Sequence, residues 1–218
     1  MKYKCLVLDH DDTVVDSSRT IHYPAFLDTL RQLRPNHDPL TFDDFNHHCF
    51  VYGFHHLCEL RYGFDKVEMM TEYAIWKNHT SNKQAPAFDG WYELLHRFKA
   101  QGGIIIVVSY SESKEIQRDY QDHFNFIPDR IYGYDAGPDN IKPHIKPIVD
   151  VLKDYELKHE DICVIDDMPV GLSMAENAKV DFVWAKWAHN DERLLEHIKK
   201  TSQHACSDVY QLIKFLEL

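Results

Sequence analysis

Leu8-Asp9-His10-Asp11-Asp12-Thr13 follows the apolar run Lys4–Leu8 without a break, and this stretch decides the fold. A short run of almost continuous apolar residues is typical of a strand covered on both faces, as in a parallel sheet. Residues two apart in an extended chain point to the same side, so the carboxylates of Asp9 and Asp11 could face one ligand where the strand ends. Taken alone, the pair is as consistent with an acidic turn as with a site.

Further short apolar runs predict four more strands, at Ile104–Val108, Ile131–Tyr134, Ile162–Ile165 and Phe182–Ala185. Amphipathic stretches typical of helices alternate with them, at Trp91–Ala100, Glu112–His123, Ile145–Tyr155 and Pro169–Ala178. A last helix is predicted over Asp208–Leu216. Strands that alternate with helices predict an α/β fold, a doubly wound parallel sheet of the Rossmann-like kind.

The segment 18–86 interrupts this alternation. It contains three helical patterns and no convincing strand, with the helices expected at Tyr23–Leu33, Phe42–Tyr62 and Lys66–Asn78. We therefore predict an α/β core formed by residues 1–17 and 87–218, and a small helical domain, residues 18–86, inserted after the first strand. Ligands of open α/β sheets bind at the carboxyl ends of the strands, so an insertion that leaves from this edge would cover the site as a lid.

Composition limits the classes of partner. The chain has 218 residues, of which 44% are hydrophobic, and a formal net charge of −11. An acidic protein repels polyanions, so we expect neither nucleic acid nor a membrane surface as a partner. A bound divalent cation can reverse the sign of the local field, so a small phosphorylated molecule remains a candidate ligand. Composition leaves the oligomeric state open.

The five cysteines are scattered, with no Cys-x-x-Cys pair. Cys5 and Cys163 lie in apolar runs and are expected to be reduced core residues. The N-terminus lacks the charged and then apolar pattern of a signal peptide, and no apolar run approaches about 18 residues. We therefore expect a cytoplasmic protein.

Polar residues follow the second and third predicted strands. Ser109 comes directly after Val108, and its hydroxyl could donate to a phosphate oxygen, but Ser109-Tyr110-Ser111-Glu112 also fits a helix capping box. Lys142-Pro143-His144-Ile145-Lys146-Pro147 follows the third strand. A lysine held at the start of a helix by a following proline can place a fixed positive charge near a carboxylate and a phosphate. On this ground alone, Lys142 and Lys146 both remain candidates.

The fourth strand ends in Asp166-Asp167, just before a helix that begins at Pro169. Acidic residues before a helix are often caps. This pair, however, is expected at the same sheet edge as Asp9 and Asp11, where clustered carboxylates would repel one another without a cation. Mg²⁺ prefers one or two carboxylates together with water and phosphate oxygens, so a magnesium site is the simplest explanation.

The order of these motifs resembles that of the haloacid dehalogenase-like hydrolase superfamily. Its first motif is similar to Asp9-His10-Asp11-Asp12-Thr13, and its other motifs are similar to Ser109, Lys142 and Asp166-Asp167. Lys142 matches better than Lys146, because Lys142-Pro143 resembles the Lys-Pro start of a helix in that superfamily. The helical insertion resembles the superfamily's first-type cap, so the resemblance extends over the whole chain.

The resemblance implies a chemistry for each motif. Asp9 would attack phosphorus to form an aspartyl phosphate, and Asp11 would act as general acid and then as general base. Ser109 and Lys142 would bind the phosphate. Mg²⁺ would be held by Asp9, the main-chain carbonyl of Asp11 and Asp167, with Asp166 supporting or sharing it.

These implications predict a magnesium-dependent phosphatase of a small phosphorylated metabolite. An acid two residues after the nucleophile favours phosphate over haloacid substrates, because a halide leaves without a proton. Phosphosugar mutases of the superfamily share both aspartates and remain an alternative. A non-catalytic binding protein that retains the fold is the alternative from a different class.

Overall fold

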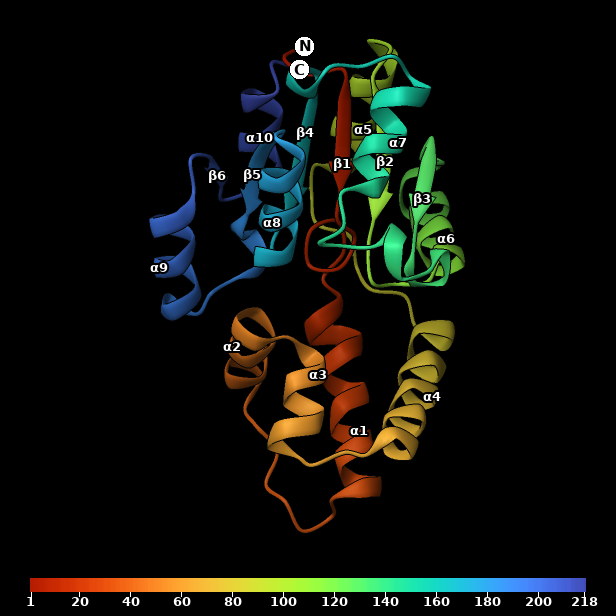
Figure 1. Ribbon diagram of the computed structural model, residues 1–218, viewed down its shortest axis with the longest axis vertical. Helices are drawn as coiled ribbons and strands as arrows, with labels where there is room; N and C mark the ends of the chain where they lie inside the picture. The colour runs from red at the N-terminus through yellow and green to blue at the C-terminus, as the bar shows by residue number, and fades with distance from the viewer.

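The computed structural model describes residues 1–218 and has a six-stranded parallel sheet at its centre, in the order β3-β2-β1-β4-β5-β6 (Figure 1). The strands are β1 (Cys5–Leu8), β2 (Ile104–Val108), β3 (Arg130–Tyr132), β4 (Ile162–Asp166), β5 (Asp181–Ala185) and β6 (Ala205–Cys206). The predicted doubly wound sheet is thereby confirmed. The third strand is shorter than the run Ile131–Tyr134 suggests, because Tyr134 already begins a 3-10 turn.

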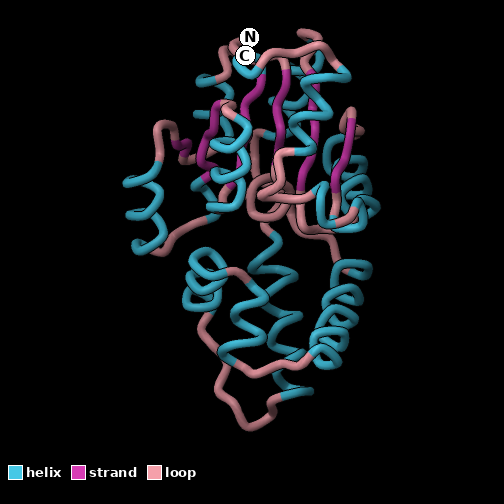
Figure 2. Tube along the Cα trace, in the orientation of Figure 1, coloured by secondary structure: helices cyan, strands magenta, loops and turns pink.

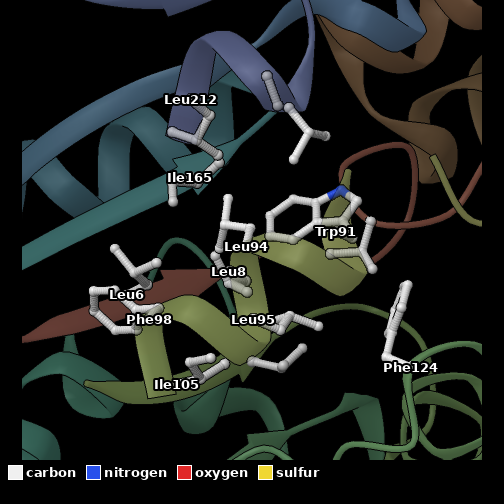
Figure 3. Close-up of a cluster of buried hydrophobic side chains, with 14 of the residues drawn as sticks. Leu6, Leu8, Trp91, Leu94, Leu95, Phe98, Ile105, Phe124, Ile165 and Leu212 are labelled. Atoms are coloured by element: carbon white, nitrogen blue, oxygen red, sulfur yellow. The ribbon is translucent and has the colours of Figure 1, made fainter. Parts of the chain in front are cut away.

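Helices cover both faces of the sheet. Alternate residues of β1 divide between two clusters, so that Leu6 and Leu8 face one side and Cys5 and Val7 the other. The first side is covered by α5 (Trp91–Ala100), α6 (Ser113–Phe124) and α10 (Val209–Phe215). Figure 3 shows Trp91, Leu94, Leu95 and Phe98 of α5 beside Leu6 and Leu8. The second side is covered by α7 (Lys146–Asp154) and α8 (Pro169–Ala178).

Two elements near the C-terminus were not predicted. Helix α9 (Glu192–Thr201) begins at the N-cap Asp191, whose carboxylate accepts a hydrogen bond from the backbone N–H of Arg193. Strand β6 is two residues long, which is too short to give a periodic pattern. Short 3-10 turns lie at Tyr134–Ala136, Pro138–Asn140, His159–Asp161 and Lys186–Ala188.

The segment 18–86 is helical and lies beyond one end of the sheet, opposite the two chain termini (Figure 1). Figure 2 shows only helices and loops in this part of the molecule. Its elements are a π-helical turn (Ser18–His22), α1 (Tyr23–Leu33), α2 (Phe42–Tyr52), α3 (Phe54–His56), a second π-helical turn (Leu57–Arg61) and α4 (Lys66–Asn82). It has a small apolar cluster of its own, which includes Phe26, Phe45 and Tyr62.

The single helical stretch expected over Phe42–Tyr62 is wrong. Helix α2 ends at Tyr52, because Gly53 adopts φ = 86°, a value that interrupts a right-handed helix and that favours glycine. The periodic apolar pattern continues across Gly53, which explains why the sequence reads as one helix.

The chain leaves and re-enters the core at adjacent places. The backbone N–H of Asp16 donates to the carbonyl of Pro86 at 2.8 Å, and that of Phe88 donates to the carbonyl of Val14 at 3.1 Å. These two connections run beside the loop after β1, so the helical segment is anchored next to Asp9 and Asp11. No helix in the structure is long and apolar enough to cross a membrane.

Candidate active site

The ends of three neighbouring strands bring the predicted site residues together. Leu8 pairs in register with Val107 of β2 and with Ile165 of β4, so these strands end at about the same level. Asp9 follows β1 directly, Ser109 follows β2, and Asp166 is the last residue of β4. The side chains that sequence analysis singled out converge at this edge and, apart from the partly exposed Asp11, they are buried: Asp9, Ser109, Lys142, Asp166 and Asp167.

Lys142 lies between two aspartates. Its Nζ is 2.8 Å from Oδ1 of Asp9 and 2.7 Å from Oδ2 of Asp166. Burial lowers the pKa of Lys142, but the two carboxylates outweigh this effect and hold the pKa above its ordinary value. The phenol of Tyr110 donates to the main-chain carbonyl of Lys142 at 2.8 Å and helps to fix its position. The amine is therefore a permanent positive charge beside Asp9.

The expectation that Lys142-Pro143 begins a helix is wrong. Helix α7 begins at Lys146, and Lys142 lies in the turn that precedes it. Lys146, the competing candidate, extends into solvent, where its Nζ contacts Asn140 and Asp150 at 2.8 Å each. The structure thus brings Lys142, and not Lys146, to the ends of the strands.

Asp9, Asp166 and Asp167 form a cluster suited to a cation. Each offers one carboxylate oxygen, and these oxygens lie within 4.8 Å of one another. Burial and the neighbouring negative charges raise the pKa of Asp166 well above its ordinary value. Burial, together with the charges of Asp9 and Asp12, raises the pKa of Asp167 to about 7, against the opposing effect of His189. The donor set is all oxygen and, when ionised, carries more negative charge than Lys142 balances, so it fits a hard divalent cation such as Mg²⁺.

Asp166 is held in place from two sides. Its Oδ1 accepts a hydrogen bond from the backbone N–H of Met168 at 2.8 Å, while Oδ2 contacts Lys142. Gly171 of α8 lies against the same side chain, and a Cβ at this position would overlap Oδ2 of Asp166. The helix can therefore approach Asp166 this closely only with glycine at position 171.

The side chain of Asp11 faces donors rather than the carboxylate cluster. Ser109 and Ser111 donate to its Oδ2 at 3.2 and 2.7 Å, and Nε2 of His22 lies 3.1 Å from its Oδ1. Burial alone would raise the pKa of Asp11, but His22, His10 and the Ser111 hydroxyl hold it well below its usual range. The alternative that Ser109-Tyr110-Ser111-Glu112 forms a capping box is wrong, because α6 begins at Ser113 with Glu112 at its N-cap.

His22 connects Asp11 to the helical segment. Nε1 of Trp76 on α4 lies 3.0 Å from Nδ1 of His22. An indole N–H can only donate, so in the neutral form of His22 Nδ1 accepts and Nε2 carries the hydrogen that is directed at Asp11. Neither spacing nor periodicity in the sequence distinguishes His22 or Trp76 from other residues of the segment.

Two further residues hold Asp167. Thr13 donates to Oδ1 at 3.2 Å, and Nε2 of His189 lies 3.1 Å from Oδ2 and 3.0 Å from the main-chain carbonyl of Asp167. Trp91 and Trp187 both donate to the carbonyl of Thr13 at 3.0 Å and fix the loop that carries it. Thr13 belongs to the first motif of the sequence, whereas nothing in the sequence pattern indicates His189.

Comparisons with known structures show the same fold at low sequence identity. A protein provisionally described as a haloacid dehalogenase-like hydrolase from Bacteroides fragilis is 20% identical, with a TM-score of 0.80 over 97% of this chain and 100% of that chain. A predicted phosphoglycolate phosphatase from Haemophilus somnus is 16% identical, with a TM-score of 0.72 over 99% and 98% of the two chains. A protein provisionally described as a beta-phosphoglucomutase from Bacteroides vulgatus is 16% identical, with a TM-score of 0.74 over 99% and 89%.

Sequence comparison is decisive at the level of the family. No curated protein matches the chain in a sequence search. A family model described as haloacid dehalogenase-like hydrolase matches residues 6–185, which include Asp9, Ser109, Lys142 and Asp166-Asp167. The chain therefore belongs to the haloacid dehalogenase-like hydrolase family.

Proposed function

We propose that the protein is a magnesium-dependent phosphohydrolase that acts on a small phosphorylated metabolite through an aspartyl-phosphate intermediate. The observation that carries this proposal is the buried group at the strand ends, in which Lys142 lies 2.8 Å from Asp9 and Asp9 shares a carboxylate cluster with Asp166 and Asp167. We further propose that residues 18–86 form the cap and that residues 1–17 and 87–218 form the catalytic core.

In the first step Asp9 is the nucleophile. A carboxylate oxygen of Asp9 forms a bond to phosphorus as the bond from phosphorus to the leaving oxygen breaks. Lys142 orients the Asp9 carboxylate, and with Ser109 it binds the transferring phosphate. The charge of Lys142 is already in place before the reaction, so it needs little reorganisation as charge develops, whereas the Ser109 hydroxyl turns from Asp11 to the phosphate.

Asp11 transfers the proton in both steps. Its low pKa favours the ionised form, which can take a proton from water as that water attacks the aspartyl phosphate. In the first step Asp11 must instead carry a proton, which it donates to the leaving oxygen. The negative charge of an approaching phosphate raises the pKa of a nearby carboxylate, so substrate binding favours that protonated form.

The metal site would use four residues. Asp9, the main-chain carbonyl of Asp11 and Asp167 would hold Mg²⁺, with Asp166 supporting or sharing it. When bound, Mg²⁺ supplies positive charge that offsets the negative charge of the transferring phosphoryl group. Asp166 also orients Lys142 through their ion pair. It therefore has a role in the site even if it does not bind the metal directly.

A phosphosugar mutase is the second candidate. It is favoured by the fold shared with a protein described as a beta-phosphoglucomutase and by the pair of acids, Asp9 and Asp11, that both reactions require. A mutase returns the phosphoryl group to the substrate, whereas a phosphatase passes it to water, so the two differ in whether inorganic phosphate is released.

The test is a panel of phosphorylated metabolites incubated with wild type and with Asp9→Asn in Mg²⁺. Wild type is expected to release inorganic phosphate from at least one compound, and Asp9→Asn from none. The matched control is Asp43→Asn, which removes an exposed carboxylate from α2 and should retain wild-type rates. Turnover of the hit by Asp9→Asn at the wild-type rate would contradict the assignment, and an isomerised sugar phosphate without phosphate release would favour the mutase.

A further inference from the structure

Phe50 is a residue of the helical segment that is buried against the core. It lies on α2 with 4% of its surface exposed, whereas its neighbours Val51 and Tyr52 are 47% and 59% exposed. Its ring packs among five side chains that we call the Phe50 socket: Trp184, His189, Leu194, His197 and Ile198. Helix α2 contacts α9 here, and Figure 1 shows the two helices on the same side of the molecule.

His189 belongs to this socket and also contacts Asp167. The rings of Phe50 and His189 are nearly perpendicular, at a centroid distance of 5.5 Å. Nε2 of His189 faces two acceptors, the Oδ2 and main-chain carbonyl of Asp167, so it carries the hydrogen. Its Nδ1 is buried and has no hydrogen-bond partner. One imidazole thus joins an apolar contact from α2 to a hydrogen bond with Asp167.

We infer that Phe50 and His189 form a latch, through which docking of α2 on the core holds Asp167 in the orientation that binds the metal. This inference rests on the proposed function, in which Asp167 is a ligand of Mg²⁺. His189 acts as a positioning residue, because it touches Asp167 and not the metal or the substrate. Hydrogen bonds to metal-binding carboxylates fix their orientation, and their loss typically weakens metal binding about 10–100-fold.

The latch has two opposing contributions. With α2 docked, the Phe50 ring is removed from water, which favours the docked state. In the docked state Nδ1 of His189 is also buried without a hydrogen-bond partner, and such an atom disfavours that state. Undocking would expose Phe50 and, once its ring leaves the His189 ring, let water reach Nδ1. The two contributions therefore partly cancel, and docking is favoured by less than the burial of Phe50 alone would give. A ligand that binds one of the two states better can therefore shift the balance.

Undocking also frees the His189 ring to turn. Asp167 would then keep only the hydrogen bond from Thr13, at 3.2 Å, as a side-chain restraint on its carboxylate. The docked state should therefore bind Mg²⁺ more tightly. Because coupling between two equilibria is reciprocal, bound Mg²⁺ should in turn favour docking of α2.

Two other contacts between the helical segment and the core are not connected to the carboxylate cluster. Arg193 and Asp44 pair at 3.2 Å near the socket, but both side chains are about half exposed, and such pairs contribute little. On the other side of the site, Tyr73 and Lys77 of α4 bond to Glu112. Neither contact reaches Asp166 or Asp167.

Calorimetric titration of Mg²⁺ into the full-length protein tests the latch. Wild type should bind, and Asp167→Asn should not. His189→Phe keeps a ring in the socket but removes the donor, and we expect about tenfold weaker binding or more. His189→Gln retains an N–H donor and should recover part of the loss.

The Phe50 variants test the other half of the latch. Phe50→Ala should weaken Mg²⁺ binding several-fold, with Phe50→Leu intermediate, while the matched control Val51→Ala should bind as wild type does. Phe50→Ala combined with His189→Phe should bind no more weakly than His189→Phe alone, because both changes break the same connection. Thermal unfolding of each variant verifies that it is folded.

A second readout follows the docking itself. Mg²⁺ should slow hydrogen–deuterium exchange of the α2 amides, Phe42–Tyr52, in wild type and should not do so in His189→Phe. The latch is wrong if Phe50→Ala and His189→Phe bind Mg²⁺ as wild type does while Asp167→Asn does not bind. If wild type binds no Mg²⁺, or Asp167→Asn binds it equally well, the metal role of Asp167 is wrong and the latch fails with it.

Discussion

Nε2 of His22 lies 3.1 Å from Oδ1 of Asp11, so the first helical turn of the inserted segment touches the residue that we propose as acid and base. Trp76, from the last helix of the same segment, fixes the orientation of His22. Two parts of the insertion that are 54 residues apart therefore meet at Asp11. The segment therefore supplies side chains that surround Asp11.

Trp76→Phe keeps an aromatic ring on α4 but removes the donor to Nδ1 of His22. We expect kcat to fall about tenfold, a fraction of the roughly 10²–10⁴ that acid–base catalysis contributes, with a smaller change in KM. His22→Ala should lower kcat further, and His22→Gln, which can still donate to Asp11, should lower it less. Steady-state kinetics on the substrate found in the panel measures these effects. Met70→Ala, an exposed change on the same helix, is the control.

Lys142→Met would leave Asp9 and Asp166 facing each other without the buried amine. Removing one partner from a buried ion pair typically costs about 3–5 kcal/mol, and we expect the free energy of unfolding to fall by about 3 kcal/mol. The matched change Lys146→Met removes a half-exposed lysine and should cost no more than about 0.5 kcal/mol. Urea denaturation in EDTA measures both, and equal losses would contradict the structural role of Lys142.

Added Mg²⁺ should stabilise the folded protein, because the carboxylate cluster exists only in the folded state. At a concentration about 100 times Kd, the gain is about 2.7 kcal/mol, which raises Tm by roughly 5–10 °C for a chain of this length. EDTA should reverse the shift and stop turnover reversibly. Thermal unfolding of Asp167→Asn should show no such shift, and turnover that persists in EDTA would refute the metal requirement.

Glu72→Gln should change how stability depends on pH. Burial raises the pKa of Glu72 from its ordinary value of 4.5 to about 7, against the charge of His22. Between these values the folded state binds more protons than the unfolded state, so the contribution of Glu72 to stability falls as pH rises from about 4.5 to about 7.

Glu72→Gln should therefore match wild type near pH 4.5 and be about 2–3 kcal/mol more stable at pH 8. Urea denaturation at the two pH values tests this difference. Glu59→Gln removes the same charge from an exposed position and should differ from wild type equally at both. A constant difference for Glu72→Gln as well would show that Glu72 is not protonated in the folded state.

Strands were predictable from the sequence because each buried strand leaves a local signal. The runs at β1, β2, β4 and β5 are apolar on both faces, so composition alone indicates them. Helix boundaries depend on single residues: Gly53 ends α2 within a continuous apolar pattern. Strand β6 was missed because two residues carry no periodicity.

The sequence by itself determined which residues meet at the edge of the sheet, since the carboxyl ends of parallel strands converge wherever such a sheet forms. This rule alone was enough to predict that Asp9, Ser109 and Asp166 lie close together. Only the tertiary structure decided the partners of these residues. His22 reaches Asp11 and His189 reaches Asp167 through contacts between distant segments, and such contacts depend on how helices pack, which leaves no pattern in the neighbouring sequence.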